Sequence, residues 1–385
     1  MTISSPNLNR NSPPMKVGVV VPNWIGDVVM ATPTLRALRQ HFGTDAEIVG
    51  IMRPYVAQVL AGTDWLDRSI YLDRKSPDRG LHTLQVARQL RQWRPDVMVL
   101  LPNSLRIGAM AWLSGAKERV GYARNGRGLL LTKRLAVPRE AGKRKPISPV
   151  DYYLELAYAL GCRRESPDLE LATLPADEAV ADAVWKKLML DRVSRVVILN
   201  SGSAIGSSRN WPAERFAELA SRIVDDEDAA VLVICGPQER ETAAAIKGLA
   251  NHPRVTSMAD QDLSLGVAKA CIRRSQLMVT TDSGPRHIAS AFNLPVLTLF
   301  GPIDFRWSDT RHPLAVNLQH HVDCRPCGKS VCPLQHHRCM SEHTVDRVYA
   351  AVRQQLARTA STRSRLGGSL VSAVAFQNVA SNPLN

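Results

Sequence analysis

The sequence predicts an α/β protein made of two doubly wound, Rossmann-like domains that face a cleft. Short runs of valine, isoleucine and leucine alternate with segments whose apolar residues recur every three or four positions, a pattern typical of parallel strands connected by helices. This alternation occurs twice, on either side of a polar stretch that contains Pro167 and Pro175. The 385 residues are more than one ordinary core holds and suit two domains.

The first series of strands and helices begins at residue 16. Its expected strands are 16–21, 47–52, 68–72 and 96–101, and its expected helices are 27–42, 53–61, 81–92 and 104–113. In the first of these helices, apolar residues from Val28 to Phe42 lie on one helical face, and Pro33 is expected to bend the early turns. Residues 121–149 are basic and rich in glycine and proline, which favours a mobile loop beside a binding face.

A helix at 151–161 and a polar interdomain linker at 162–178 are expected before the second series. The expected strands of that series are 195–200, 229–235, 276–280 and 294–300, and its expected helices are 212–225, 239–250, 264–272 and 285–292. The resulting division is a disordered extension (1–15), a first domain (16–170), a second domain (171–343), a last helix (344–358) and a flexible tail (359–385).

Composition limits the classes of function. No apolar run approaches the roughly 20 residues that span a bilayer, and the N-terminus has no apolar core of a signal peptide, so we expect a cytoplasmic protein. Lys plus Arg number 49 against 35 Asp plus Glu, a net charge of +14, which indicates an anionic partner or a solvated basic surface. Aromatic residues make up only 5%, and no RNA- or zinc-finger-type pattern occurs, so we do not expect nucleic-acid binding.

Polar motifs follow three of the expected strands, where ligands bind in such sheets. At the first, Gly26 allows close backbone approach and Asp27 offers a carboxylate to a substrate hydroxyl, although the spacing alone favours a role of Asp27 as the cap of the helix. At the second, NSGSAIGSSRNWP (200–212), backbone amides beside Arg209 suit a phosphate, although a flexible loop with a solvated arginine fits equally.

The third motif is TTDSGPRHIASA (280–291). Asp282 and Ser283 stand at the strand end, Gly284 permits a tight turn, and the helix that follows presents an amino terminus suited to a diphosphate. His287 is expected to pack on the helix, because no nucleophile is paired with it.

Cysteines are concentrated near the C-terminus. Four lie within VDCRPCGKSVCPLQHHRCM, at Cys324, Cys327, Cys332 and Cys339, beside two histidines. This density indicates a structural zinc site, but the spacing leaves disulfides and free thiols open. The single cysteines at 162, 235 and 271 are expected to be small buried hydrophobes.

Taken together, PNWIGDVVMATPTLRAL, LPNSLRIGA, SGSAIGSSRNWP, TTDSGPRHIASA, LFGPID and the cysteine segment resemble the ADP-heptose:lipopolysaccharide heptosyltransferases, glycosyltransferase family 9. The likeness spans about residues 16–355, and the W-x-GD and LPNS elements are more similar to heptosyltransferase II than to heptosyltransferase I. It implies a GT-B fold with an N-terminal acceptor domain, a C-terminal nucleotide-sugar domain and a last helix that crosses back to the first domain. Such enzymes transfer L-glycero-D-manno-heptose to a heptose of the lipid A core, with inversion and without a metal.

The resemblance also implies roles for residues. Asp27 matches the residue that acts as general base in this family. It lies at a helix start, which favours the charged form of the carboxylate and so weakens it as a base. Burial can offset this effect by raising the pKa of Asp27. The expected donor-binding residues are Ser203, Arg209, Glu239, Asp282, Ser283 and Gly284. The expected acceptor-binding residues are Trp24, Gly26, Asn103, Ser104 and Arg106.

Some positions depart from the family or leave a choice. Arg209 stands where the family usually has a lysine, and Glu241 is an alternative to Glu239 for the ribose. Arg286 is interpreted as a surface charge in preference to a second phosphate contact. The basic loop from Arg119 to Arg144 is expected to meet core phosphates or carboxylates, and the protein to associate peripherally with the anionic inner face of the membrane.

Three alternatives remain open. The chain can be a family 9 enzyme for another sugar nucleotide or acceptor, or a GT-B sugar-nucleotide epimerase. It can be a nucleic-acid-binding module that uses the basic loop. The cysteine cluster can serve redox or metal sensing, apart from any transfer chemistry.

Overall fold

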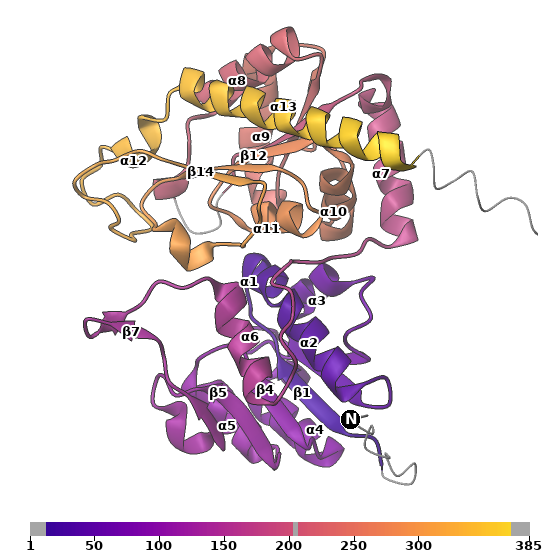
Figure 1. Ribbon diagram of the computed structural model, residues 1–385, viewed down its shortest axis with the longest axis vertical. Helices are drawn as coiled ribbons and strands as arrows, with labels where there is room; N and C mark the ends of the chain where they lie inside the picture. The colour runs from indigo at the N-terminus through magenta and orange to yellow at the C-terminus, as the bar shows by residue number, and fades with distance from the viewer. Residues whose placement is uncertain (1–12, 203–206, 371–385) are drawn as a thin grey trace, which may run out of the picture. The chain divides into compact units, whose positions relative to one another are not determined.

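The structure, a computed structural model, describes residues 13–202 and 207–370. The chain divides into two compact units (Figure 1). Unit 1 comprises Met1–Ala172 and Ser308–Arg311, and unit 2 comprises Thr173–Trp307 and His312–Asn385. The expected extension (1–15) lies mostly outside the described residues.

Unit 1 is built on a parallel sheet whose order, in the described residues, is β3-β2-β1-β4-β5-β6. The strands are β1 (Lys16–Val20), β2 (Glu47–Met52), β3 (Arg68–Tyr71), β4 (Val97–Leu100), β5 (Glu118–Tyr122) and β6 (Lys133–Leu135). The central strands β1 and β4 are almost wholly buried, because helices cover both faces of such a sheet. The first four strands are therefore confirmed within a residue or two.

The helices of unit 1 are α1 (Ile25–Met30), α2 (Thr32–Phe42), α3 (Pro54–Leu60), α4 (Thr83–Trp93), α5 (Leu105–Leu113) and α6 (Pro149–Ala159). The single helix expected at 27–42 is wrong, because two helices meet at Ala31. Pro33 has no amide hydrogen to donate to the carbonyl of Val29. The Thr32 hydroxyl donates to that carbonyl instead, at 2.8 Å.

The loop expected at 121–149 is also wrong over much of its length. It contains the end of β5, a 3-10 turn at Arg127–Leu130, strand β6, and a hairpin of β7 (Arg139–Glu140) and β8 (Lys143–Arg144). Strand β6 is only three residues long and pairs with β5 along its length. Its extended conformation depends on that pairing, so the sequence of these three residues alone did not predict a strand.

Unit 2 repeats the arrangement with a parallel sheet of order β11-β10-β9-β12-β13-β14 in the described residues. The strands are β9 (Val196–Asn200), β10 (Ala230–Ile234), β11 (Val255–Ser257), β12 (Leu277–Thr281), β13 (Val296–Phe300) and β14 (Ala315–Gln319). Both sheets have the 3-2-1-4-5-6 order of a doubly wound fold, which confirms the expected fold class. The edge strands β11 and β14 were not expected, since one is very short and the other only half-buried.

The helices of unit 2 are α7 (Pro175–Lys187), α8 (Ala213–Asp226), α9 (Arg240–Ala250), α10 (Leu265–Arg274), α11 (Gly284–Ala291), α12 (Arg338–Ser341) and α13 (Val345–Leu370). Helix α7 begins inside the expected linker, because Pro175 is suited to a first helical turn. Among the described residues, no helix is both long and apolar enough to cross a membrane.

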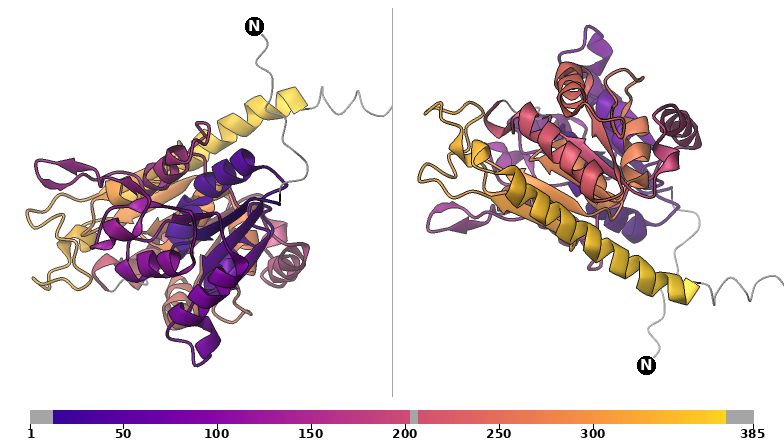
Figure 2. Two further views of the ribbon diagram at one scale, coloured as in Figure 1. Left: turned by 90° about the horizontal axis from the view of Figure 1, so that it is seen from below. Right: turned by 90° about the horizontal axis from the view of Figure 1, so that it is seen from above.

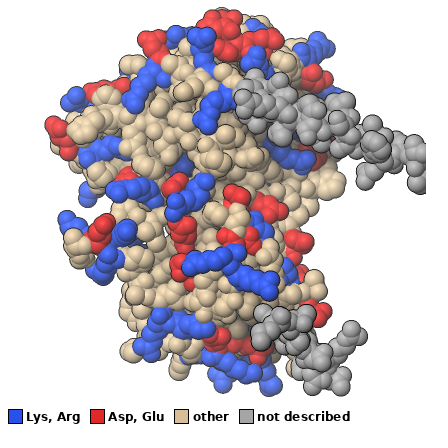
Figure 3. Space-filling model, in the orientation of Figure 1, with Lys and Arg blue, Asp and Glu red and all other residues tan. Residues whose placement is uncertain are grey.

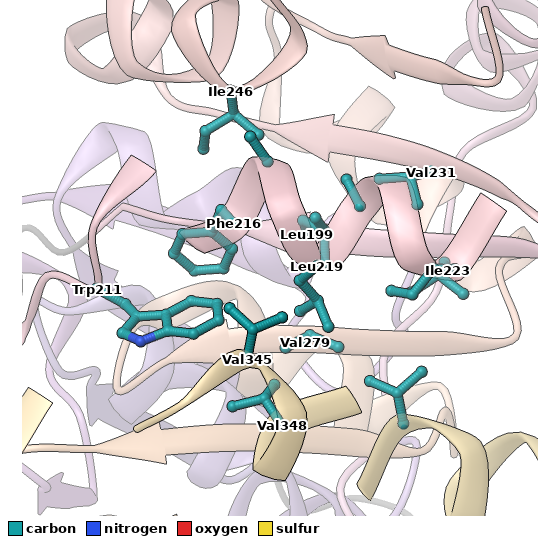
Figure 4. Packing of buried hydrophobic residues seen from close by; sticks show 14 of the residues in the cluster. Leu199, Trp211, Phe216, Leu219, Ile223, Val231, Ile246, Val279, Val345 and Val348 are labelled. Carbon is teal, nitrogen blue, oxygen red and sulfur yellow. The ribbon is translucent and has the colours of Figure 1, made fainter. Parts of the chain in front are cut away.

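The core of unit 2 forms where α8 and α13 pack on the sheet (Figure 4). Phe216 and Leu219 of α8 meet Val345 and Val348 of α13 over Val279 of β12, and all five side chains are buried. The two residues of each pair are three positions apart, which places them on one face of their helix. Helix α13 is thereby part of the unit 2 core.

Helix α13 differs in length from the expected last helix. It continues from Val345 to Leu370 (Figure 2, right), so the expected tail does not begin at residue 359; residues 371–385 lie outside the described chain. Its main packing partners are α8 and β12 of unit 2. The return of this helix to the first domain stays a prediction.

Candidate functional site

Asp27 lies in the first turn of α1, at the carboxyl end of β1. The N-cap of this helix is Trp24, and no side chain caps it, so Asp27 does not serve as a helix cap. Burial raises the pKa of Asp27 to about 6, and a hydrogen bond from the Tyr153 hydroxyl opposes this rise. Burial thus gives a carboxylate with a pKa near neutrality, as a general base needs.

Tyr153 of α6 is a hydrogen-bond partner of Asp27 and was not expected from the sequence. Its hydroxyl donates to Asp27 Oδ1 at 3.4 Å. The ring is buried, and burial and the Asp27 charge raise the pKa of the hydroxyl well above its usual value. Tyr153 therefore remains protonated and acts as a donor. The only sequence signal was a tyrosine pair, 152 and 153, in an apolar helix.

The neighbouring residue, Tyr152, contacts Asn103, which is one of the residues expected to bind the acceptor. Its ring stacks on Tyr122 at 3.7 Å, and its hydroxyl donates to Asn103 Oδ1 at 3.2 Å. Asn103 Oδ1 also accepts from Arg127 Nη2 at 3.0 Å. Ser104 caps α5, because its hydroxyl accepts from the amide of Ile107. Asn103 and Ser104 thus have structural partners, and their contact with an acceptor stays a prediction.

Arg127 is fully buried and was not recognised in the sequence. Its guanidinium donates to the carbonyl oxygens of Tyr122, Pro102 and Leu100, as well as to Asn103. Burial lowers the pKa of Arg127 to about 10, so the group stays charged at neutral pH. It joins the ends of β4 and β5 and fixes the loop that carries Asn103.

A basic pocket of about 300 Å³ opens at the carboxyl ends of β1, β2 and β4. Its charged lining is Arg53, Asp73, Arg74, Lys75 and Arg106, and its aromatic lining is Trp24 and Tyr55. Burial lowers the pKa of Arg106, and the charges of Arg74 and Arg53 lower it further, so these guanidinium groups lie close together. Asp73 pairs with Arg53 at 3.3 Å, which leaves the lining with a net positive charge.

Of the residues expected to bind the acceptor, Trp24 and Arg106 line this basic pocket. Trp24 is exposed, with 55% of its surface accessible, and Gly26 is buried in α1. Arg106 Nη1 donates to Thr83 Oγ1 at 2.6 Å, which orients its guanidinium in the wall of the pocket. A larger cavity, of about 480 Å³ beside β3, includes none of the expected site residues.

In unit 2, Asp282 follows β12 and lies between two arginines. Arg209 Nη1 contacts Asp282 Oδ2 at 2.8 Å, and Arg286 Nε contacts Asp282 Oδ1 at 3.3 Å. Arg286 is only 3% exposed and stacks on Phe300, so its interpretation as a surface charge is wrong. It faces inward because residues four apart in this region share one side with Asp282. Two guanidinium groups and one carboxylate leave a positive centre.

The expected anion site at the start of α11 has the predicted local structure. Ser283 is the N-cap residue in an extended conformation, and Gly284 is the first residue of the helix. The Ser283 hydroxyl accepts from Asn200 Nδ2 at 2.8 Å and lies 3.1 Å from Thr280 Oγ1. Asn200, which was not among the expected residues, thereby ties the end of β9 to the helix start.

Glu239 lies after β10, beside the loop that follows β9. Its Oε2 accepts from the amide of Gly236 at 2.8 Å. Gly202 leaves it room, because a Cβ at that position would lie 2.0 Å from Glu239 Oε1. Glu241 is exposed in the first turn of α9, so Glu239 fits a nucleotide-side role better. Ser203 lies outside the described residues.

Two further expectations concern His287 and the cysteines. His287 is buried in α11, and burial lowers its pKa well below its usual value, which confirms that it packs on the helix. All seven cysteines are free thiols. Cys162 and Cys271 are buried as expected, whereas Cys235 is half-buried.

The net charge of the chain is not gathered in one patch on the face that Figure 3 shows, where basic and acidic side chains are interspersed. Among the described residues, basic side chains lie close together in the pocket of unit 1 and in the arginine pair around Asp282. Both of these groups lie at the carboxyl ends of parallel strands.

The sequence and the fold of this chain are similar to those of known proteins. The model of glycosyltransferase family 9 (heptosyltransferase) matches residues 83–338. Lipopolysaccharide heptosyltransferase 2 of Escherichia coli K12 is 26% identical over 301 residues, covering 75% of this chain and 83% of the relative. Lipooligosaccharide heptosyltransferase 2 of Campylobacter jejuni is 23% identical over 354 residues, covering 88% and 99%. The solved structure of E. coli ADP-heptose LPS heptosyltransferase II superposes with a TM-score of 0.73 at 21% identity, covering 89% and 99%.

Proposed function

Because this chain belongs to glycosyltransferase family 9, we propose that it transfers L-glycero-D-manno-heptose from ADP-heptose to a heptose of the lipopolysaccharide inner core. The names of its relatives support the donor and the acceptor. The structural observation that carries the proposal is Asp27, a carboxylate at the end of β1 whose burial raises its pKa to about 6.

Asp27 would act as the general base. Its carboxylate accepts the proton of the acceptor hydroxyl while that oxygen attacks the anomeric carbon of the heptose. The bond between this carbon and the diphosphate oxygen breaks, ADP leaves with the electron pair, and the configuration inverts. A base with a pKa of about 6 is ionised at neutral pH yet basic enough to assist this transfer.

The donor half would be unit 2. Negative charge grows on the ADP oxygen as the bond breaks, and fixed cationic donors stabilise it without reorganisation. Arg209 and Arg286 are held by Asp282 beside the start of α11, where backbone amides add a further attraction for phosphate. Glu239 would accept hydrogen bonds from the ribose. These arginines supply the cationic role, so the proposed transfer requires no metal.

The acceptor half would be the basic pocket of unit 1. Arg53, Arg74, Lys75 and Arg106 suit phosphates or carboxylates of the core oligosaccharide, because guanidinium groups bind such anions in bidentate pairs. Trp24 offers an exposed ring on which a sugar can pack. A glycolipid acceptor also implies peripheral association with the anionic inner face of the cytoplasmic membrane, which the charge of +14 would favour.

The test is ADP release from ADP-heptose with a mono-heptosylated Kdo-lipid A acceptor. We expect release only when the acceptor is present, and a loss of about 10²- to 10⁴-fold in Asp27→Asn with ADP affinity unchanged. Asp45→Asn, a change at an exposed aspartate of the same unit, is the matched control.

Three outcomes would contradict the proposal. Full activity of Asp27→Asn would exclude its role as base. Conversion of the sugar nucleotide without an acceptor would favour an epimerase. Inactivity with ADP-heptose but activity with another sugar nucleotide would retain the family and reject the donor.

A further inference from the structure

Helix α5 of unit 1 exposes large apolar side chains to solvent. Leu105 and Trp112 are each more than half exposed, and Ala109, between them, is half-buried. Because these positions are separated by four and three residues, they lie on one side of the helix, over a length of roughly 10 Å. The opposite side of α5 is buried in the core of unit 1 through Ile107 and Met110.

The 3-10 turn at Arg127–Leu130 extends this exposed strip. It packs against α5, and it comes close because residue 108 is glycine: a Cβ there would lie 3.0 Å from Arg127 Cβ. Gly108 is a surface neighbour of both Leu105 and Trp112 on the helix. Leu129, in the same turn, is 85% exposed. Leu105, Trp112 and Leu129 together are called the apolar face below.

The part of the chain that forms the apolar face is strongly basic. Residues 83–135, from α4 to β6, contain ten Lys and Arg but only two Asp and Glu. Both acidic side chains pair with lysines, Asp96 with Lys117 at 3.1 Å and Glu118 with Lys133 at 2.7 Å. Among the described residues, the arginines of this stretch form no ion pair with an acidic side chain. Their positive charge is therefore not neutralised locally.

Arginines lie on both sides of the apolar face. Helix α4 packs beside α5 on the same face of the sheet (Figure 1), and it carries Arg88 and Arg91, both exposed, and no acidic residue. On the side of the 3-10 turn, Arg119 donates to the carbonyl of Leu130 at 2.8 Å, and Arg134 of β6 is exposed. An apolar centre thus has a cationic border.

We propose that the apolar face docks on a bilayer that contains anionic lipids. Contiguous exposed apolar side chains of this kind mark contact surfaces. Trp112 and the two leucines would enter the region between the headgroups and the acyl chains, where tryptophan is favoured. The flanking arginines would contact lipid phosphates, to which guanidinium groups bind in bidentate pairs. An anionic bilayer matches both the apolar centre and the cationic border.

The apolar face begins beside the basic pocket of unit 1. Leu105 is followed directly by Arg106, which lines that pocket. A glycolipid acceptor keeps its acyl chains in the bilayer, so docking by this face would bring the membrane surface to the edge of the pocket that receives the sugar. This link to the acceptor rests on the proposed function, whereas the exposed side chains and their charged border do not.

The first experiment tests the cationic border. Flotation of the full chain with vesicles of phosphatidylglycerol and phosphatidylethanolamine measures binding. Arg88→Gln/Arg91→Gln should weaken it about tenfold or more. Lys186→Gln/Arg192→Gln, the matched control, removes the same charge from exposed positions of unit 2 and should change binding by less than about twofold. Equal losses in the two variants would mean that the charge of the whole chain attracts it to the membrane, and would reject the docking face.

The second experiment tests the apolar centre. Trp112→Ser/Leu129→Ser should lose most vesicle binding, and circular dichroism shows whether it is folded. The matched control is Leu249→Ser/Leu334→Ser, at two leucines of unit 2 that are also more than half exposed, and it should bind as the wild type does. Unchanged binding in the folded Trp112→Ser/Leu129→Ser variant would overturn the proposal. Self-association of the wild type that this variant loses, without any vesicle binding, would assign the face to a second copy of the chain.

The third experiment tests which tryptophan enters the bilayer. Lipids with brominated acyl chains quench the fluorescence of a tryptophan that inserts among them. Trp112→Phe should remove most of the quenching, whereas Trp24→Phe, at the other strongly exposed tryptophan, should retain it. Quenching that depends on Trp24 in place of Trp112 would place the pocket, and not α5, against the membrane.

A fourth measurement separates this proposal from the proposed function. With an acceptor oligosaccharide freed of its acyl chains, Trp112→Ser/Leu129→Ser should release ADP as fast as the wild type, because its pocket is unchanged. With the glycolipid embedded in vesicles, its rate should fall several-fold. Equal rates on both acceptors would reject the docking face and retain the transferase. Vesicle binding through this face in a chain that transfers no heptose would retain the face and reject the proposed function.

Discussion

At the scale of single residues, Asp27 and Tyr153 set the pH at which the proposed base works. Burial raises the pKa of Asp27 to about 6, and the hydrogen bond from Tyr153 opposes that rise. The carboxylate is the reactive form, so activity should be full above this pKa and fall as the pH decreases through it.

Tyr153→Phe tests this pairing. Because the lost hydrogen bond stabilised the charged carboxylate, the acid limb of the kcat profile should move to higher pH. Tyr158→Phe is the control, since Tyr158 lies on the same helix and its hydroxyl contacts Glu165 instead. A uniform loss of kcat without movement of the limb would indicate only a structural role for Tyr153.

The same burial predicts that Asp27 costs stability. A folded-state pKa of about 6 against a usual value of 3.8 means that stability is highest when the group is protonated and falls as the pH rises from about 4 to above 6. By linkage the cost at neutral pH is up to about 3 kcal/mol. Asp27→Asn should therefore raise Tm at pH 7.5 more than at pH 4, whereas an equal Tm change at both would contradict the assignment.

At the scale of elements, the position of the donor residues depends on how α8 and α13 pack against the sheet of unit 2. Leu219 is fully buried in this core, and Leu249, near the end of α9, is 56% exposed. The two leucines differ in burial and share the same chemistry.

Leu219→Ala should therefore lower the free energy of unfolding by about 2 to 5 kcal/mol. Leu249→Ala should change it by less than about 0.5 kcal/mol. Chemical denaturation of the two variants measures both values. Equal effects would mean that the packing of α8 does not determine the stability of unit 2.

At the scale of the whole molecule, the charge of +14 predicts attraction to anionic surfaces that salt weakens. The Debye length falls to about 10 Å at 0.1 M salt, so binding to vesicles of anionic lipid should decrease steadily as salt is added. Co-sedimentation with anionic and with zwitterionic vesicles measures this. Binding that is equal for the two lipids, or insensitive to salt, would argue against electrostatic membrane association.

Much of the architecture could be predicted from periodicity. Most expected strands and helices agree with the structure within two residues, because a doubly wound sheet repeats a local pattern of buried strand and amphipathic helix. The strand-to-helix junctions also located Asp27, Arg209 and Asp282, since motifs at the carboxyl ends of parallel strands lie next to the ligand side of the fold. The roles proposed for these three residues could be inferred from residue types that are close together in the sequence.

The tertiary structure alone decided which side chains support those residues. Tyr153 donates a hydrogen bond to Asp27, Arg127 to Asn103, and Asn200 to Ser283. In the first and the last of these pairs, more than 80 positions separate the two residues in the sequence. The burial of Arg286 and the raised pKa of Asp27 likewise depend on packing. Periodicity describes how one segment faces the core, but a hydrogen bond or a desolvated charge depends on atoms that distant segments bring together.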